Sequence, residues 1–250
     1  MEKEITFIND HRADPARLQA PTDNGFALIA IEVGHWAGPF PLPTRARSEA
    51  LDQVEPLLQS LNNRDNVIEA TAFRAALRPP GEGGRLLRAA GVAPARYDIV
   101  LLVRTRTVTD LDAIRTDQAW QKLVTLLDTR ARRMHQLTAS SPARIADVDH
   151  DPGNVFLFNY FHSADPKTVR AVWEYTAGWF QRTTALADSV PMQPLPEASH
   201  DYALINHCSW PNFRSFLPHL LLRPSFRRFV LANFAANTIA AQPIIYRRHM

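Results

Sequence analysis

Cysteine and long apolar runs are both scarce in this chain of 250 residues. The only cysteine is Cys208, so no disulfide can form within the chain, and no thiolate cluster can hold zinc or an iron–sulfur centre. No stretch approaches the roughly 20 apolar residues that a membrane-spanning helix needs. The first residues also lack the basic segment and apolar core of a secretory signal. We therefore expect a soluble protein of the cytoplasm with no membrane partner.

The sequence also lacks a cluster of positively charged residues. The chain has 28 Lys and Arg against 25 Asp and Glu, and its arginines are spread among acidic residues. Binding to nucleic acid needs clustered positive charge. The densest basic run, Arg130, Arg132 and Arg133, falls at the end of a predicted helix, where cations are favourable. We expect no nucleic-acid partner.

One pattern of elements occurs twice along the chain. Residues 97–103 predict an apolar strand that leads to a helix at Ala119-Trp120, and residues 202–207 predict one that leads to a helix at Ser225-Phe226. Such repetition indicates two like modules, each of which needs something to cover its sheet. We expect an N-terminal arm (1–24), a first module (25–150) and a second module (151–250).

Hydrophobic patterning supplies the elements of each module. It predicts strands at 26–33, 67–77, 97–104, 155–161, 189–195, 202–208 and 243–248, and a weaker strand somewhere within 136–148. It predicts helices at 48–61, at 117–134, after the cap at Asp165, and in two parts over 213–237, broken at Pro218 and Pro224. Pro191 and Pro194 favour an edge position for the strand at 189–195. The glycine-rich run at 79–84 lacks the spacing of a phosphate-binding loop and is interpreted as a surface insertion.

The second copy carries the features on which a family resemblance rests. Its strand ends near Trp210, a loop follows, and a helix is entered through Arg223-Pro224-Ser225-Phe226. This order resembles the antibiotic biosynthesis monooxygenase and EthD-like group of dimeric α+β barrels, and it covers nearly the whole chain twice. The resemblance implies an α+β fold of two tandem ferredoxin-like modules whose antiparallel sheets pack into a dimeric-type barrel. One chain would then hold a whole barrel, and a homodimer through the remaining surface stays open.

The resemblance does not select one chemistry, because the same superfamily includes haem-degrading oxygenases, chlorite dismutases, and cofactor-free oxygenases and cyclases. Asn159, Trp173 and His207 invite comparison with the Asn, Trp and His set of the haem-degrading members. Trp173 falls on a helix and His207 within a strand, however, and the spacing differs from that family. Haem is therefore kept only as an alternative, and no metal site or cofactor is assigned.

Strand alternation sorts the polar residues of the second copy. Asn159 shares a face with Leu157, and Tyr160 and His162 share the other. If the strands at 155–161 and 202–208 are neighbours, Asn159 lies near Asn206 or His207. The two asparagines then either bridge the strands or face a ligand, since a buried polar group needs a partner.

Histidine suits proton transfer near neutrality, so His162 and His207 are predicted as acid and base, with Asn159 orienting an oxygen. Either histidine can equally be a satisfied structural group. Cys208 next to His207 points to the opposite face of its strand and is not a nucleophile for that base. The predicted ligand-binding residues are Tyr160, Trp173, Trp179, Asn206 and Trp210, where an aromatic wall would suit a flat molecule or simply form core.

Two further sets of charged residues leave alternatives open. Asp147, Asp149 and Asp151 flank His150 at the junction between copies, where they would form either a divalent-cation site or a solvated turn. Glu32 and Arg104 interrupt apolar strands of the first copy and would pair with each other.

Three functions remain. The first is a small-molecule enzyme, a cofactor-independent monooxygenase or a cyclase or isomerase on an aromatic or polyketide-like compound. The others are a non-catalytic binding or structural protein, and a haem protein. The second copy is richer in polar and aromatic residues, so we expect any site there, for a small-molecule ligand.

Overall fold

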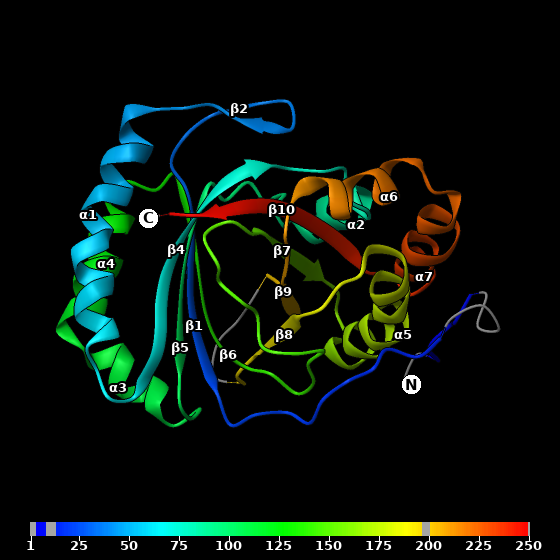
Figure 1. The fold of residues 1–250 in the computed structure, drawn as a ribbon. Helices are drawn as coiled ribbons and strands as arrows, with labels where there is room; N and C mark the ends of the chain where they lie inside the picture. The colour runs from blue at the N-terminus through cyan, green and yellow to red at the C-terminus, as the bar shows by residue number, and fades with distance from the viewer. Residues whose placement is uncertain (1–3, 9–13, 197–200, 250) are drawn as a thin grey trace.

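Eight antiparallel strands close into one barrel in the computed structural model, which describes residues 4–8, 14–196 and 201–249 (Figure 1). Around the barrel the order is β1-β5-β4-β10-β7-β9-β8-β6. The strands are β1 (Gly25–Glu32), β4 (Val67–Leu77), β5 (Ile99–Thr105), β6 (Arg133–Ser140), β7 (Val155–His162), β8 (Ser189–Pro194), β9 (Leu204–Trp210) and β10 (Ala240–Arg248). A short hairpin, β2 (Trp36–Ala37) and β3 (Phe40–Pro41), stands apart. The tandem α+β barrel is confirmed.

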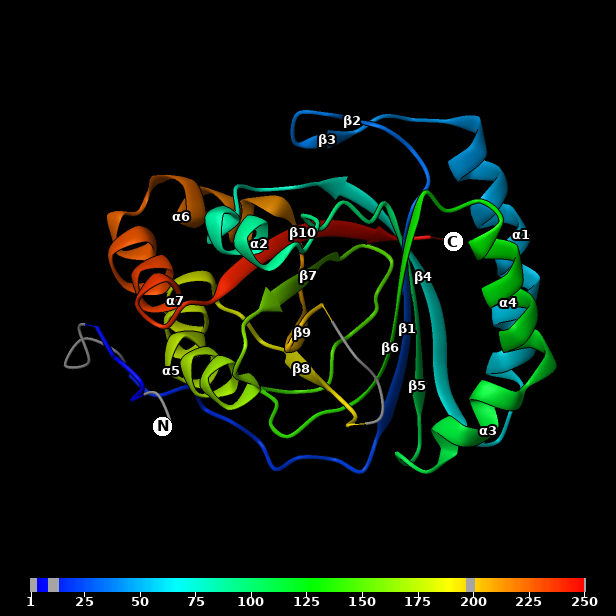
Figure 2. The same ribbon diagram turned by 180° about the vertical axis from the view of Figure 1, so that it is seen from behind.

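Two groups of helices cover the barrel on opposite sides, as Figures 1 and 2 show. The first half is covered by α1 (Arg45–Asn62), α3 (Asp110–Thr116) and α4 (Gln118–Asp128). The second half is covered by α5 (Pro166–Thr184), α6 (Leu217–Leu222), the π-helical segment η3 (Phe226–Leu231) and α7 (Ala232–Ala236). Two short elements, α2 (Gly84–Ala90) and the 3₁₀ turn η2 (Phe213–Ser215), complete this side. Among the described residues, no helix is both long and apolar enough to cross a bilayer.

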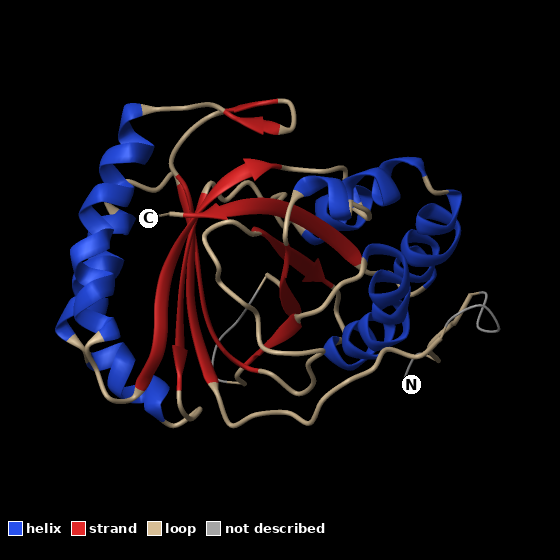
Figure 3. Cartoon of the chain, in the orientation of Figure 1, coloured by secondary structure: helices blue, strands red, loops and turns tan. Residues whose placement is uncertain are grey.

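The strands lie between two groups of helices, drawn in red and blue in Figure 3. This layered arrangement creates three apolar cores. The barrel interior is packed with side chains such as Phe73, Phe156, Phe158 and Tyr246. A second core lies between the first-half strands and α1 and α4. The third lies between the second-half strands and α5, η3 and α7. The barrel interior is therefore a packed core, and room for a ligand has to be sought outside it.

Local sequence signals explain where the long helices begin. Thr44 caps α1 by accepting a hydrogen bond from the Arg47 amide, and Asp165 caps α5 by accepting one from the Lys167 amide, with Pro166 in the first turn. Pro56 lies inside α1, and the helix continues through it. The apolar stripe of α1 against the sheet outweighs the backbone hydrogen bond that this proline removes.

Two expected elements differ in the structure. The helix predicted at 117–134 is shorter, since α4 ends at Asp128 and residues from Arg133 onward form β6. The strand at 189–195 is not an edge strand, because β8 pairs with β9 on one side and β6 on the other. Pro191 and Pro194 are tolerated because closure of the barrel at β8 needs only two residue pairs with β6, Ala139 with Pro194 and Ser140 with Gln193.

The N-terminal segment runs along the helices of the second half (Figure 1). The amides of Thr6 and Ile8 donate to the side chains of Asn237 and Asn233, each at 2.9 Å. Gly178 of α5 has no side chain where the backbone of Asp14 crosses it. Residues 9–13 of the predicted arm lie outside the described residues.

Candidate functional site

The second half contains an apolar pocket of about 470 Å³ between its sheet and its helices. Its floor is the outer face of β7, β9 and β10, and its roof is α6, η3 and α7. Five aromatic side chains line it: Phe180, Trp210, Phe216, Phe226 and Phe234. A concave apolar pocket of this size is the usual form of a small-molecule site.

The broken roof explains why this space stays open. Pro224 lies just after the end of α6 and prevents the helix from continuing. The next segment, η3, is a π-helix, a rare form that is found mostly at functional sites when it does occur. Short helical pieces cannot present one continuous apolar stripe to the sheet, so a gap is left between roof and floor.

A strap of residues 79–82 closes one side of the pocket. Its Glu82 pairs with Ala241 of β10 through two backbone hydrogen bonds, and Gly81 fits because any Cβ there would collide with the Ala241 carbonyl. The sequence interpretation of 79–84 as a surface insertion missed this role. The signal present was Pro79-Pro80-Gly81 directly after a strand, which fixes a turn but not its destination.

Asn159 is the polar group in the floor of the pocket. It lies on β7 opposite Asn206 of β9, so the two strands are neighbours as expected. The Oδ1 atom of Asn159 is buried and accepts no hydrogen bond from any described residue. A buried acceptor without a donor costs about 1–3 kcal/mol, and a ligand that donates to it recovers that cost.

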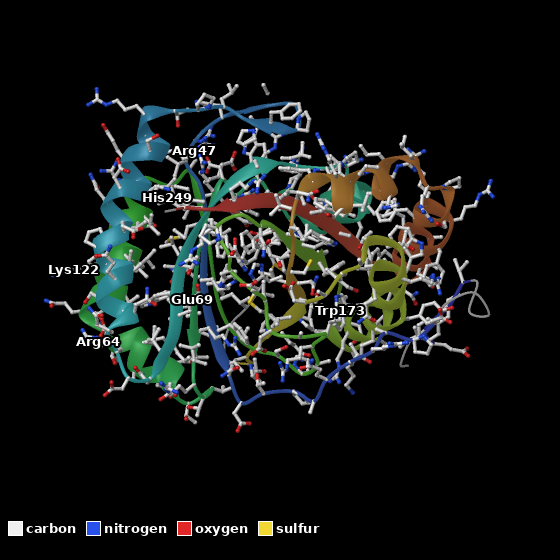
Figure 4. All side chains as sticks on the ribbon, in the orientation of Figure 1. Arg47, Arg64, Glu69, Lys122, Trp173 and His249 are labelled. Carbon is white, nitrogen blue, oxygen red and sulfur yellow. The ribbon has the colours of Figure 1, made fainter. Side chains whose placement is uncertain are left out.

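Beyond Asn159 the pocket meets a small recess of about 30 Å³. The recess is lined by Trp173 of α5, Ser189, Asn206 and Cys208 in addition to Asn159 and Trp210; Figure 4 labels Trp173. Asn206 is satisfied without Asn159, because its Oδ1 accepts from Ser189 Oγ at 2.8 Å. The bridge between the two asparagines, one of the two alternatives left open by the sequence, is absent among the described contacts. A space of 30 Å³ is enough for a water molecule or the hydroxyl of a ligand.

Cys208 does not supply a nucleophile to this recess. Burial, reinforced by the charge of Asp188, raises the pKa of its thiol well above the ordinary value. Its neighbour His207 lies on the other face of β9, inside the barrel. The geometry agrees with the alternation expected from the sequence.

The predicted site residues thus fall into separate places. Asn159, Trp173, Asn206 and Trp210 come together around the connected pocket and recess. Trp179 lies behind the pocket wall, where its indole donates to Ser225 Oγ at 3.1 Å and holds the start of η3. His162, at the end of β7, meets the Asp201 carbonyl at 2.6 Å and lines neither hollow.

Tyr160 and His207 point into the barrel. The Tyr160 hydroxyl meets that of Tyr246 at 3.2 Å, and Tyr246 donates to the Tyr97 carbonyl at 2.8 Å, so Tyr160 is the donor to Tyr246. Burial raises the pKa of Tyr160 well above its usual value. His207 is stacked on Phe158, with ring centroids 4.0 Å apart.

His207 belongs to a hydrogen-bonded row, Glu69–His150–His207, that sequence reasoning missed. His150 Nδ1 lies 2.6 Å from Glu69 Oε2, and its Nε2 lies 2.8 Å from His207 Nε2; Figure 4 labels Glu69 on β4. The adjoining hollow measures only about 10 Å³. The row therefore ties the segment between β6 and β7 to the barrel wall and leaves no room for an organic substrate.

The protons of this row can be assigned from its partners. His207 Nδ1 faces the Leu157 carbonyl, so Nδ1 is the donor. Burial, and next the charge of His150, lower the pKa of His207 well below its ordinary value, so its Nε2 is bare and accepts from His150. Burial alone would raise the pKa of Glu69, but the hydrogen bond and charge of His150 lower it overall.

The structure also decides two expectations about charged residues. Glu32 and Arg104 do not pair: Arg104 binds Asp147 at 2.6 Å, and Glu32 faces Arg132 and Arg133. Within the described residues, no group of three or more His, Cys, Asp or Glu side chains is placed to hold a metal ion. Residues 147–153 instead form hydrogen-bonded turns, with Asp149 and Asp151 accepting from backbone amides two residues ahead.

Two other hollows are open at the surface. A groove of about 550 Å³ runs between α4 and β6 and is lined largely by polar side chains, such as Gln121 and Gln136. Another, of about 340 Å³, lies beside the strap at Arg78 and Gln242. Neither has the aromatic enclosure of the second-half pocket.

Comparison with known proteins relates this geometry to solved structures. No family model matches the sequence, and no curated protein matches it significantly. An anthrone oxidase-like protein aligns over 94% of this chain and 95% of its own, with a TM-score of 0.61 and 6% identity. The chain has the dimeric α+β barrel fold.

Two further structures share this dimeric α+β barrel. A monooxygenase candidate from Fusobacterium nucleatum has a TM-score of 0.52 at 8% identity, covering 90% of this chain and 95% of that one. A mutant chlorite dismutase from Candidatus Nitrospira defluvii has a TM-score of 0.51 at 12% identity, covering 93% and 95%. At these identities the likeness establishes the fold alone.

Haem can be tested against the donor set of the pocket. An axial ligand to haem iron is usually His, Cys, Met or Tyr. None of the described residues that line the 470 Å³ pocket is of these types, and the thiol of Cys208 in the recess is held protonated. The residues present do not fit haem held by a protein ligand.

Proposed function

We propose that this chain binds a flat, apolar small molecule between the sheet and helices of its second half, with a donor group of the ligand directed at Asn159. The observation that carries the proposal is the unpaired Oδ1 of Asn159 in an otherwise apolar, aromatic pocket. The apolar lining favours burial of the ligand, and the asparagine fixes its orientation.

The reaction class that this arrangement supports is cofactor-independent oxygenation of an aromatic or polyketide-like compound. The pocket has no histidine in its described lining to act as the base, so the substrate must be acidic enough to lose its proton to water, as a phenol or anthrone is. Asn159 would bind the neutral hydroxyl of the substrate through its Oδ1 acceptor. Once negative charge develops on that oxygen, only the Nδ2 donor of Asn159 could stabilise it. The fold is shared with an anthrone oxidase-like protein, which adds support to this class.

Binding is tested with a matched pair of ligands, 2-naphthol and naphthalene, which differ by one hydroxyl. Titration is followed by tryptophan fluorescence, since Trp210 lines the pocket. We expect 2-naphthol to bind about 3- to 10-fold more tightly than naphthalene, the range of one hydrogen bond. Asn159→Leu should remove that difference and leave the binding of naphthalene in place.

Catalysis is tested separately by oxygen uptake with anthrone in chelator-treated buffer. One anthrone and one O₂ should yield one anthraquinone and one water. Uptake that needs the protein and falls in Asn159→Leu supports an oxygenase. Tight binding with no turnover favours the second candidate, a non-catalytic binding protein, which the hydrogen bond between Ser189 and Asn206 in the recess supports.

A further inference from the structure

We infer that the ligand of the second-half pocket carries an acidic group, and that Arg227 of η3 binds this group at the mouth. The inference rests on the proposed function, because it names the substrate class of the same pocket. It joins two observations: the position of Arg227 and the charge of the chain segment that builds the pocket.

Arg227 is the only Arg or Lys among the described lining residues of the pocket. It is exposed, as is Leu221 of α6, which is 53% exposed and also lines the pocket. The mouth of the pocket therefore reaches solvent beside α6 and η3. No described side chain forms an ion pair or hydrogen bond with the Arg227 guanidinium, so the cation is available to a ligand.

The segment 202–250 contains six arginines and neither aspartate nor glutamate. The even mixture of charges expected from the whole sequence does not hold here. This segment supplies β9 and β10 of the floor and all of the roof. Arg223 and Arg228 flank Arg227 on the exposed roof, so the potential around the mouth is positive and favours an anionic group.

Glu82 of the strap is the acidic residue of the described lining. Its Oε1 accepts a hydrogen bond from the Gly83 amide at 2.9 Å, which anchors the carboxylate to the strap. It belongs to the wall formed by the strap, whereas Arg227 belongs to the roof. A ligand with its apolar rings between them, a hydroxyl at Asn159 and a carboxylate at Arg227 satisfies the polar groups of floor and roof together.

The chemical class is thus a hydroxylated aromatic carboxylic acid. A carboxylate accepts two parallel hydrogen bonds from a guanidinium, which gives direction as well as attraction. Because the mouth is exposed, the gain in binding affinity from the Arg227–carboxylate pair is that of a partly solvated ion pair, and it decreases as salt is added.

The test compares 6-hydroxy-2-naphthoic acid with its methyl ester, which has the same rings and hydroxyl but no charge. We expect the acid to bind about 5- to 10-fold more tightly at low salt, with the preference shrinking at about 0.5 M NaCl. Arg227→Gln should abolish the preference. The matched control Arg228→Gln removes the same charge one residue further along, outside the lining, and should keep most of it. Glu82→Gln should increase the preference.

The inference would be overturned by an ester that binds as well as the acid, or by a preference for the acid that survives Arg227→Gln. Binding of 2-naphthol would in that case still support the proposed function of the pocket. Failure of 2-naphthol, acid and ester alike to bind the folded wild-type protein would overturn the proposed function as well. Equal losses in Arg227→Gln and Arg228→Gln would show a diffuse charge effect and also count against a specific contact.

Discussion

The two halves of the barrel differ in the space between sheet and helices: the first half has an open groove with a largely polar lining, whereas the second encloses an aromatic pocket. In the first half, α1 and α4 run 18 and 11 residues and bury Leu58, Leu123 and Leu127 against the strands. In the second half, α6, η3 and α7 run only six, six and five residues, and a 470 Å³ pocket remains. The pocket therefore arises from interruption of the helical layer, not from the sheet.

Removing a leucine from each half should change stability most. Leu123→Ala empties a fully buried position and should lower the free energy of unfolding by about 2–5 kcal/mol. Leu220→Ala trims a half-buried side chain that already lines the pocket, so it should cost about 1 kcal/mol or less. Denaturant unfolding of both variants measures the contrast, and equal losses would contradict a hollow second half.

Adding volume should also destabilise the first half more than the second. Ala72 of β4 and Ala241 of β10 are both buried on the outer face of the sheet. Ala72→Leu overpacks the first half and should lower the free energy of unfolding by about 1–3 kcal/mol. Ala241→Leu projects into the pocket and should leave stability near that of the wild type while weakening 2-naphthol. A large loss of stability in Ala241→Leu with unchanged binding would show that the pocket is not where the structure places it.

A pH titration separates the packed barrel interior from the pocket. His207 is neutral when folded, because its pKa is lowered, whereas in the unfolded chain it takes up a proton near its ordinary pKa of 6.5. The unfolded state then binds more protons, so stability should fall as pH drops below 6.5, by at most about 1.4 kcal/mol per pH unit from this group.

The variant His207→Gln tests the origin of that slope. It removes the titrating ring and should flatten the dependence of the unfolding free energy between about pH 6.5 and 5. Glu69, whose folded pKa is lowered, contributes a loss only below its ordinary value of 4.5. A slope that is unchanged in His207→Gln would assign the effect to another group.

A smaller change in stability is expected from the unsatisfied acceptor. Asn159→Leu replaces a half-buried amide, whose buried Oδ1 has no donor, by an apolar side chain of similar size, so the free energy of unfolding should rise by about 1 kcal/mol. Asn62, whose amide binds both backbone groups of Ala70, is the matched control, and Asn62→Leu should lower stability. Destabilisation by both variants would mean that Asn159 has a structural partner.

Patterning along strands made much of this arrangement predictable. Alternation in β7 placed Asn159 on the face opposite Tyr160, and the pairing of β7 with β9 set Asn159 against Asn206. The first relation follows from the two-residue period of a strand, and the second from the strand order that the resemblance to ferredoxin-like modules implies.

The remaining features depend on contacts between distant segments. His150 reaches His207 and Glu69 from positions 57 and 81 residues away, and the strap meets β10 about 160 residues later. No periodicity in the sequence encodes such contacts. Pro224 predicted a break in the last helical region, but only the packed structure shows that the break leaves a pocket, and that Arg227 stands at its mouth.

A crystal structure of the protein with 2-naphthol would examine the pocket itself. We predict a ring system packed against Trp210 and Phe234, with its hydroxyl within hydrogen-bond distance of Asn159 Oδ1. A pocket closed by its own helices, with Asn159 bonded to a neighbouring protein group and the naphthol elsewhere or absent, would contradict a ligand site in the second half.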